Sequence, residues 1–306
     1  MMLRSASKLL KLNVFFILVL VLASSCKHTS PLEGQYYFQA LGKEANIVAT
    51  ADVKKLNEAY PNAVSTGVSY IDDNAERVSV ALYKDEYNET DTYPVPAEEL
   101  KFYGGIEGKF SKTLGNSGLS LSKEFSKVKE GKIKYYTNAE QTLNLAFPES
   151  DLLLFASDSY VKAYDESYKN RQLYINDVDA ERMGSAIVSC YVREPKTMID
   201  LGFDLPLATL LQMNKALVSV NEENGQYYLN GQLELKDEKL AETMMTILRN
   251  MEIQKAKRNG ERPNYALIST YYVQEGEFIE LAPQLLDSNQ FKEVVNKISN
   301  IAGGLI

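Results

Sequence analysis

The sequence contains few of the residues on which most catalytic and metal sites depend. Among 306 residues there is one histidine, His28, and there are two cysteines and no tryptophan. One histidine excludes a site with several histidine ligands. His28 also precedes the part of the chain that we expect to fold, which excludes Ser-His-Asp or Cys-His catalysis there. Two cysteines form at most one disulfide, so a cysteine-stapled scaffold is excluded as well.

Motifs for nucleotide and acyl chemistry are also missing. The part that we expect to fold has no Gly-x-Ser-x-Gly sequence, no P-loop and no dinucleotide-binding glycine motif. We therefore expect no cofactor and no metal, and binding rather than catalysis. A hydrolase that uses two carboxylates needs no histidine and stays open as an alternative, although the sequence singles out no pair of acids for it.

Clustered basic residues are lacking too. The formal net charge is −8 and the isoelectric point is about 5.0. An acidic surface repels phosphate backbones, and no stripe of lysine and arginine overrides this sign in the sequence, so we expect no nucleic-acid partner. The overall composition, with 45% hydrophobic and 24% charged residues, is typical of a globular protein.

Only one long apolar run occurs, and it stands near the N-terminus. Residues 1–11 carry three basic residues and no acid, and Leu12 to Ala23 is apolar except for Asn13. A membrane-spanning helix needs ~20 apolar residues, so this run is too short to span. A positive segment, an apolar segment and small residues in this order predict a signal peptide over residues 1–25.

The junction Leu22-Ala23-Ser24-Ser25-Cys26 resembles the lipobox of bacterial lipoprotein precursors. It departs from the commonest pattern, which has leucine three residues before the cysteine and glycine or alanine directly before it. The resemblance implies cleavage before Cys26 and attachment of diacylglycerol and an acyl chain such as palmitate to this residue. Several chains anchor a protein stably, whereas one does so marginally. By the same analogy, Lys27 favours the outer membrane, and the expected location is the bacterial cell envelope.

Beyond a lipidated tether at residues 26–35, the pattern predicts an α+β body with a mainly antiparallel sheet and packed amphipathic helices. We expect strands at Ala45–Ala51 and Ala186–Val192, and we expect Asp52 to cap a helix. Leu152–Ser157 is a further strand, followed by Asp158 as a second cap. We expect halves at 36–180 and 181–306, either related to each other or forming one continuous domain.

Paired runs of alternating residues predict hairpins and two later helices. The Asn-Gly pair at 224–225 is a strong hairpin signal. Helices are expected after Asp237 and from Ser288. The glycines between 104 and 118 read as a looser stretch. The expected hairpins are Val68–Ile71 with Arg77–Tyr83, Lys132–Thr137 with Gln141–Phe147, Ala216–Val220 with Gln226–Leu235, and Tyr265–Val273 with Glu277–Leu281.

Several polar features are interpreted as structural. Cys190 stands in an apolar strand pattern and is expected to be a buried, inert thiol. Two carboxylate clusters lack the calcium-loop spacing and are interpreted as solvated turn residues. They are Asp72, Asp73 and Glu76, and Asp177, Asp179 and Glu181.

The segment Met198–Leu217 is too apolar for one face of a solvated helix. Core packing is the simpler interpretation of this density. Alternatively, the segment and the methionines of a later helix form a deformable pocket for an acyl chain or a partner helix. The candidate pocket residues are Met198, Phe203, Leu207, Leu211, Met244 and Met251.

These patterns lead to one preferred function and two alternatives. We expect a lipid-anchored envelope lipoprotein that acts as a non-catalytic binding or structural module. Its partners would be the membrane, through Cys26, and an unidentified envelope protein. The folded body only loosely resembles lipoprotein domains of unknown function. The alternatives are a carrier of a hydrophobic ligand and the carboxylate hydrolase.

Overall fold

The computed structural model describes residues 35–83, 101–195 and 210–303, except positions 42, 44, 62, 64–68, 158 and 171. Side chains are not described at 166 and 297–303. Cys26 and the expected pocket residues Met198, Phe203 and Leu207 thus lie outside the described residues. Tyr36–Ile306 forms one compact unit. Among the described residues, no helix has both the length and the hydrophobicity that crossing a membrane requires.

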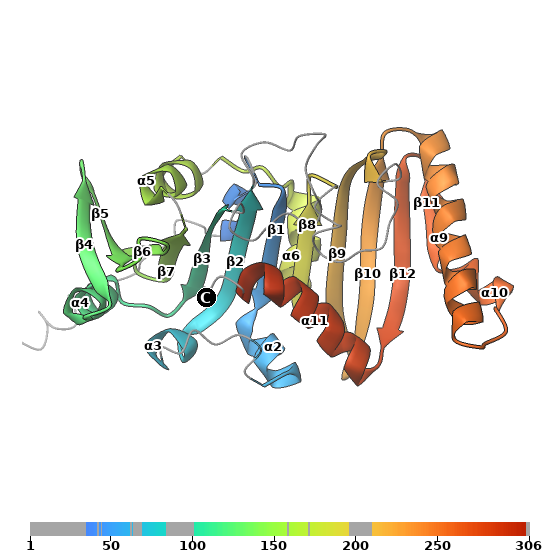
Figure 1. Cartoon of the computed structure of the whole chain (residues 1–306), viewed down its shortest axis with the longest axis horizontal. Helices are drawn as coiled ribbons and strands as arrows, with labels where there is room; N and C mark the ends of the chain where they lie inside the picture. Colours follow the sequence, from blue (N-terminus) through green and yellow to red (C-terminus); the bar gives the residue numbers. More distant parts are fainter. Residues whose placement is uncertain are drawn as a thin grey trace, which may run out of the picture. The chain divides into compact units, whose positions relative to one another are not determined.

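The unit is built on a 12-stranded antiparallel sheet (Figure 1). The strand order is β11-β12-β10-β9-β8-β1-β2-β3-β7-β6-β5-β4. The strands are β1 (Ile47–Asp52), β2 (Ala75–Tyr83), β3 (Lys101–Gly108), β4 (Phe125–Glu130), β5 (Ile133–Asn138), β6 (Asn144–Glu149), β7 (Leu152–Ala156), β8 (Val188–Val192), β9 (Met213–Glu223), β10 (Gln226–Leu235), β11 (Tyr272–Glu275) and β12 (Phe278–Leu286).

Helices pack against this sheet, which confirms the expected α+β class. The helical elements are η1 (Tyr37–Leu41), α2 (Val53–Ala59), α3 (Ser69–Asp72), α4 (Lys112–Leu121), α5 (Tyr160–Ala163), the π-helical turn η3 (Tyr164–Lys169), α6 (Asp177–Ser185), α9 (Glu238–Arg258), α10 (Tyr265–Ile268) and α11 (Ser288–Gly303).

The connections are similar on both sides of the central β1–β8 pair. Each of these strands is followed outward by two antiparallel strands, β2 and β3 on one side and β9 and β10 on the other. A helix and an edge strand come next, α4 and β4 or α9 and β11. The chain then returns from the edge strand toward the centre. On one side β5, β6 and β7 lead back to β3, and on the other side β12 alone leads back to β10. The strands before and after residue 180 belong to one continuous sheet, and residue 180 itself lies in helix α6.

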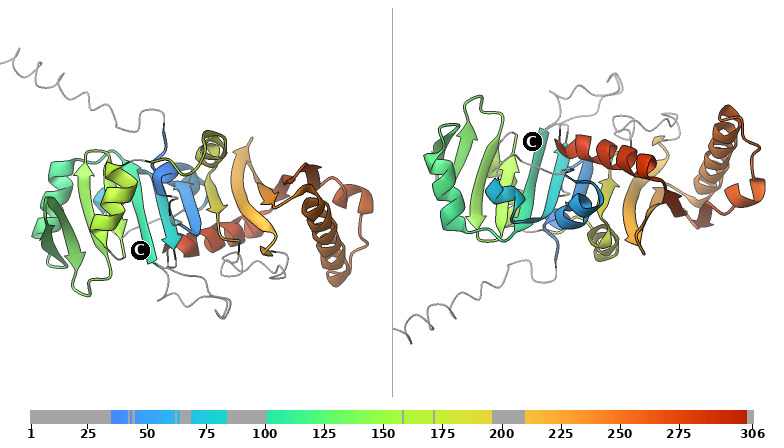
Figure 2. Two further views of the ribbon diagram at one scale, coloured as in Figure 1. Left: turned by 90° about the horizontal axis from the view of Figure 1, so that it is seen from above. Right: turned by 90° about the horizontal axis from the view of Figure 1, so that it is seen from below.

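The two faces of the sheet carry different side chains. On one face, apolar side chains such as Ala49 and Phe155 belong to a core that includes residues of α2, α9 and α11. The opposite face carries η1 and α6, and Figure 2 shows α11 and α6 on opposite sides of the sheet. On that face, Thr50 lies in register with Ser79 and Ser189, and these buried hydroxyl groups form a polar row.

Local capping and turn signals are confirmed. The Asp52 carboxylate accepts a hydrogen bond from the Lys55 backbone N–H and caps α2. Asp237 caps α9 in the same way. Asn224 and Gly225 have φ values of 53° and 77° in the turn that joins β9 and β10. Such positive φ angles are what a type I′ hairpin turn requires.

Three other expectations about elements are wrong or shifted. Ser69–Asp72 is the helix α3, so β2 has no hairpin partner there and pairs with β1 and β3 instead. Tyr265–Ile268 is the helix α10, and only β11 and β12 form the expected hairpin. The cap of α5 is Ser159, whose hydroxyl accepts from the Lys162 backbone N–H. Asp158 lies outside the described residues.

The glycines expected to form a loose stretch lie in regular structure. Gly104 and Gly105 lie inside β3. A Cβ atom at Gly104 would lie 2.2 Å from the Ser79 carbonyl oxygen, and one at Gly105 would lie 2.5 Å from the Tyr37 ring. Glycine is therefore required here by the close approach of neighbouring groups rather than by a flexible backbone.

Candidate functional site

A groove lies on the hydroxyl-bearing face of the sheet, beside α6 and over β9, β10 and β12. Its volume is about 310 Å³. The lining combines hydroxyl, amide and charged groups with apolar residues such as Leu217 and Leu281. The lining residues are Arg182, Ser185, Leu217, Ser219, Asn221, Asn230, Gly231, Gln232, Glu280, Leu281, Ala282 and Pro283.

Helix α6 forms one wall and is tied to the sheet at its N-terminal end. Its N-cap is Asn176, whose side chain accepts from the Asp179 backbone N–H at 2.9 Å. The Asp179 carboxylate is buried and pairs with the Lys215 ammonium of β9 at 2.7 Å. Lys215 also pairs with Glu234 of β10 at 3.4 Å. The interpretation of Asp179 as a solvated turn residue is therefore wrong, because this carboxylate anchors α6.

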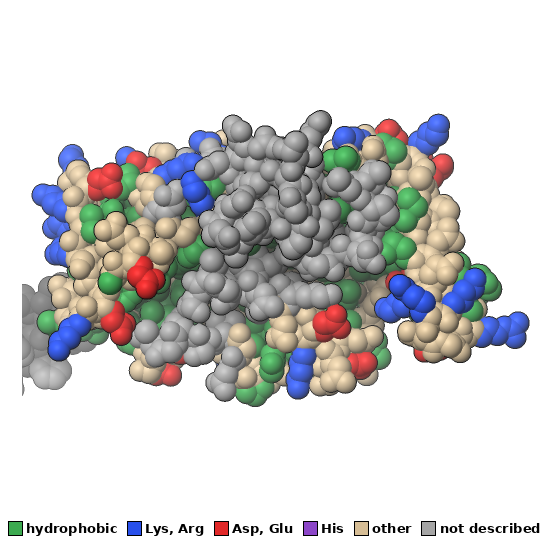
Figure 3. Space-filling view, in the orientation of Figure 1, with side chains coloured by type: hydrophobic (Ala, Val, Ile, Leu, Met, Phe, Trp, Pro, Cys, Tyr) green, Lys and Arg blue, Asp and Glu red, His purple; other side chains and the backbone are tan. Residues whose placement is uncertain are grey.

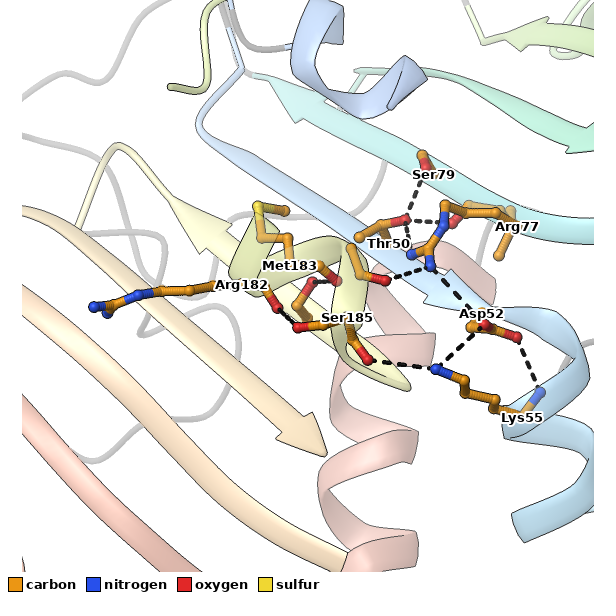
Figure 4. Close-up of polar contacts among 11 residues, drawn as sticks. Thr50, Asp52, Lys55, Arg77, Ser79, Arg182, Met183 and Ser185 are labelled. Carbon is orange, nitrogen blue, oxygen red and sulfur yellow. Dashed lines mark hydrogen bonds and ion pairs between the residues drawn. The ribbon is translucent and has the colours of Figure 1, made fainter. Parts of the chain in front are cut away.

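The C-terminal end of α6 is held by two cations (Figure 4). Arg77 of β2 donates to the Gly184 carbonyl at 2.8 Å, and Lys55 of α2 donates to the Ser185 carbonyl at 3.5 Å. Arg77 also donates to the Thr50 hydroxyl at 3.3 Å. Terminal helix carbonyls lack partners within the helix, and positive groups there oppose the negative end of the helix dipole. These contacts fix the position of the groove wall relative to the central strands.

Charged groups on the two sides of the groove neutralise each other. Arg182 of α6 donates to both carboxylate oxygens of Glu280 on β12, at 3.1 and 3.3 Å. Gln232 of β10 donates to the same carboxylate. The ion pair is accessible, since the Arg182 side chain is 43% exposed. The groove therefore offers amide and hydroxyl groups rather than a net charge.

The floor contains a polar atom that lacks a partner. The Asn221 Oδ1 oxygen has no accessible surface and no hydrogen-bond partner within the described part of the chain. Such an acceptor costs about 1–3 kcal/mol when buried without a donor. Nearby, the register of β12 shifts between the partners of Leu229 and Gly231, so Asn230 lies at a bulge. Bulges interrupt strand pairing and redirect side chains.

A second groove, of about 440 Å³, lies between α2 and the start of β2. It contains the carboxylate cluster of Asp72, Asp73 and Glu76, and also Lys54 and Lys109. Lys109 pairs with Glu76 at 3.3 Å between two well exposed side chains. No group of three metal-ligating side chains occurs in the ranges that the structure describes. This groove therefore carries no argument for a calcium site.

The structure places the other expected site residues apart from both grooves. Leu211 is 41% exposed, Met244 is buried in the core beneath α9, and Met251 is partly buried on the same helix. None of these three lines either groove. Cys190 is buried as expected, and burial raises the pKa of its thiol to about 12. The thiolate form that reacts is thus suppressed at neutral pH.

Glu107 on β3 is a further carboxyl group with a shifted pKa. Burial raises its pKa to about 7, and the nearby Arg77 guanidinium only partly opposes this shift. Its Oε1 oxygen accepts from the Tyr37 backbone N–H at 3.4 Å, and its Oε2 oxygen is buried without a partner among the described residues. Glu107 lines neither groove. Its shift therefore reflects burial beneath η1, and a substrate has no path to it through these grooves.

Sequence reasoning missed the groove residues. The available signal was the strict alternation along β10, where Tyr228, Asn230, Gln232 and Glu234 share one face. Four successive polar positions on one face of a strand indicate a face without apolar cover. The alternation does not reveal that Arg182 and Glu280, from distant parts of the sequence, lie across the same groove.

Comparison with known proteins establishes the fold only. No protein-family model and no curated protein matches the chain. The fold is similar to crystal form III of TP0453, with a TM-score of 0.56 and 13% identity over 84% of this chain and 96% of that chain. Crystal form I gives a TM-score of 0.54 and 13% identity over 85% and 96%. Crystal form IV gives 0.55 and 12% over 84% and 95%.

Proposed function

We propose that the protein is a lipid-anchored protein of the bacterial envelope whose body binds a partner through the groove beside α6. The supporting observation is the groove itself, which has a volume of about 310 Å³ and is lined by the partly exposed amide side chains of Asn230 and Gln232. A bound segment can exchange hydrogen bonds with these amide groups in place of water.

The fixed walls of the groove favour binding. Helix α6 is held at both ends, by Lys215 and by Arg77 and Lys55, so the groove is formed before a partner arrives. Preformed sites lose little conformational entropy on binding. The lining has donors and acceptors but no nucleophile next to a general base, which favours recognition over reaction. We infer that the partner is an envelope protein whose backbone and polar side chains match these groups.

Site-specific photo-crosslinking in living cells tests the groove. A photoreactive phenylalanine analogue is placed at Asn230 or Gln232 in the groove, and at exposed Lys239 on α9 as the control. We expect a discrete adduct from the two groove positions and none of the same mass from Lys239. The absence of adducts from both groove positions would contradict binding here. Equal adducts from all three positions would do the same, because they indicate random collision.

The anchor is tested separately. Cells that express the chain or its Cys26→Ser variant are fed a clickable fatty acid, and labelling of the protein is measured on a gel. The lipoprotein assignment requires labelling of the natural chain and none of the variant. Persistent labelling of the variant would overturn the anchor while leaving the groove hypothesis intact, so the two failures are distinguishable.

A further inference from the structure

The hairpin of β4 and β5 carries a basic surface in an otherwise acidic protein. Residues 123–134 contain five lysines and two glutamates, whereas the whole chain has a formal net charge of −8. Figure 3 shows Lys and Arg side chains gathered at the end of the unit that β4 and β5 occupy. The expectation that the sequence lacks clustered basic residues is therefore wrong for this segment, although acids elsewhere outweigh it in the total charge.

Three of these lysines project from one face of the hairpin. Lys129 pairs in register with Lys134, and Lys127 lies two residues along the same strand, so their side chains share a face. All three residues are exposed. We call Lys127, Lys129 and Lys134 the lysine edge. Like charges directly opposite each other on paired strands destabilise a hairpin. Within the described ranges, no carboxylate forms an ion pair with any of the three.

Strand β4 is also the last strand of the sheet. It pairs with β5 on one side, and no described strand pairs with its other side. Alternate N–H and C=O groups of an edge strand point outward and can bond to an added strand. Its six residues are enough to form several such bonds.

We propose that β4 is a docking edge for an extended segment of another protein that carries carboxylates at every second position. This surface is separate from the groove beside α6 and goes beyond the function proposed above. An added strand would place alternate side chains on the face of Lys127 and Lys129, because both strands have a period of two. Carboxylates at those positions would neutralise the repulsion between Lys129 and Lys134. The backbone would supply the remaining contacts.

Lysines on an edge strand also hinder unspecific strand pairing. Here they exclude neutral and basic strands and admit acidic ones, which makes the same residues a device for specificity. A polyanion without a strand conformation would use the lysines but not the backbone. The experiment below separates these cases.

Fluorescence anisotropy with synthetic peptides and the full chain in detergent tests the docking edge. One labelled peptide alternates glutamate with threonine and valine, and an isomer of the same composition has its glutamates in one block. A third peptide has the alternating sequence with N-methyl groups on the amides that would face β4. We expect only the alternating unmethylated peptide to bind tightly, with about tenfold loss for the block isomer and the methylated peptide.

Charge-reversed variants complete the test. Lys127→Glu with Lys129→Glu should weaken binding of the alternating peptide at least about tenfold. Lys236→Glu with Lys239→Glu changes the net charge equally at exposed positions elsewhere and should leave binding unchanged. Circular dichroism checks that both variants are folded. Equal binding of the block or methylated peptide, equal loss in both variants, or no binding of the alternating peptide would overturn the docking edge.

Discussion

Replacement of Glu107 by glutamine should change the pH dependence of stability. The Glu107 carboxyl is largely enclosed beneath η1, and among the described residues only its Oε1 oxygen has a hydrogen-bond partner, the Tyr37 backbone N–H at 3.4 Å. Burial disfavours the charged form, and the guanidinium of Arg77 on the neighbouring strand does not fully compensate. The pKa accordingly rises from 4.5 to about 7 in the folded protein.

The sign and size of the effect follow from proton linkage. Between these two pKa values the folded state holds a proton that the unfolded state has lost, so the free energy of unfolding falls as pH rises. The stability that the protonated Glu107 side chain contributes is fully present below pH 4.5 and is lost by the time the pH passes about 7. The difference between the two pKa values corresponds to about 3 kcal/mol at pH 8. Folding at neutral pH is thus opposed by the cost of ionising this carboxyl group.

Glutamine keeps the shape of the side chain and remains neutral. At pH 8 we expect Glu107→Gln to unfold at higher urea concentration than the natural chain, with a gain of about 1–3 kcal/mol. The gain is smaller than 3 kcal/mol if the glutamine amide group, at the position of Oε2, is buried without a hydrogen-bond partner. At pH 4.5 the gain should vanish or reverse. Urea titrations followed by circular dichroism at pH 4.5, 6 and 8 measure this difference.

The matched control is Glu277→Gln, which removes an exposed carboxylate in the turn between β11 and β12, several strands away from Glu107 on β3. Its stability relative to the natural chain should change little between pH 4.5 and 8. Titration of all other groups cancels when variant and natural chain are compared at the same pH. A difference for Glu107→Gln that is the same at all three pH values would refute the reasoning, because it would show that Glu107 ionises normally in the folded state.

Three further predictions test the packing of the sheet and its helices. Arg77→Ala leaves the Gly184 carbonyl of α6 without its donor and should lower the free energy of unfolding by about 2–4 kcal/mol in urea titrations. Gly105→Ala pushes a Cβ atom into the Tyr37 ring of η1 and should lower the free energy of unfolding by about 1–3 kcal/mol. Gly118→Ala in α4 places its Cβ atom in open space, with no atom within 4 Å, and should be neutral or stabilising in the same assay. Cys190 should resist alkylation in the native protein and react after unfolding, as measured by mass spectrometry; rapid native labelling would contradict its burial.

Much of the local structure could be predicted because its causes are local. Asp52 and Asp237 cap helices with their own side chains, and the turn at Asn224 and Gly225 depends on backbone angles that these two residues favour. Gly104 was misread because its cause is not local. Its missing side chain makes room for a carbonyl group of the neighbouring strand β2, and nothing in the flanking sequence records that approach.

The candidate site was harder to predict for the same reason. Arg182 and Glu280 are 98 residues apart in sequence, and their contact depends on the position of α6 and on the register of β12. The Asn221 side chain has no sequence signature, because its missing partner becomes visible only in the folded state. The lysine edge differs from both. No strand was expected at Lys127 and Lys129, so their spacing of two residues was not interpreted as a shared face, and the net charge of the chain averaged these lysines away.

Both proposed binding surfaces lie where the pairing or covering of the sheet ends. At the central strands, each face is covered, and the polar row of Thr50, Ser79 and Ser189 is buried and satisfied internally. The groove lies where α6 gives way to the open face of β10, and the outer side of β4 has no described neighbour. Since several strands separate these places and no residue belongs to both, a change at one should not alter affinity at the other. In both proposals, the covered centre supplies rigidity, and recognition belongs to surfaces on either side of it.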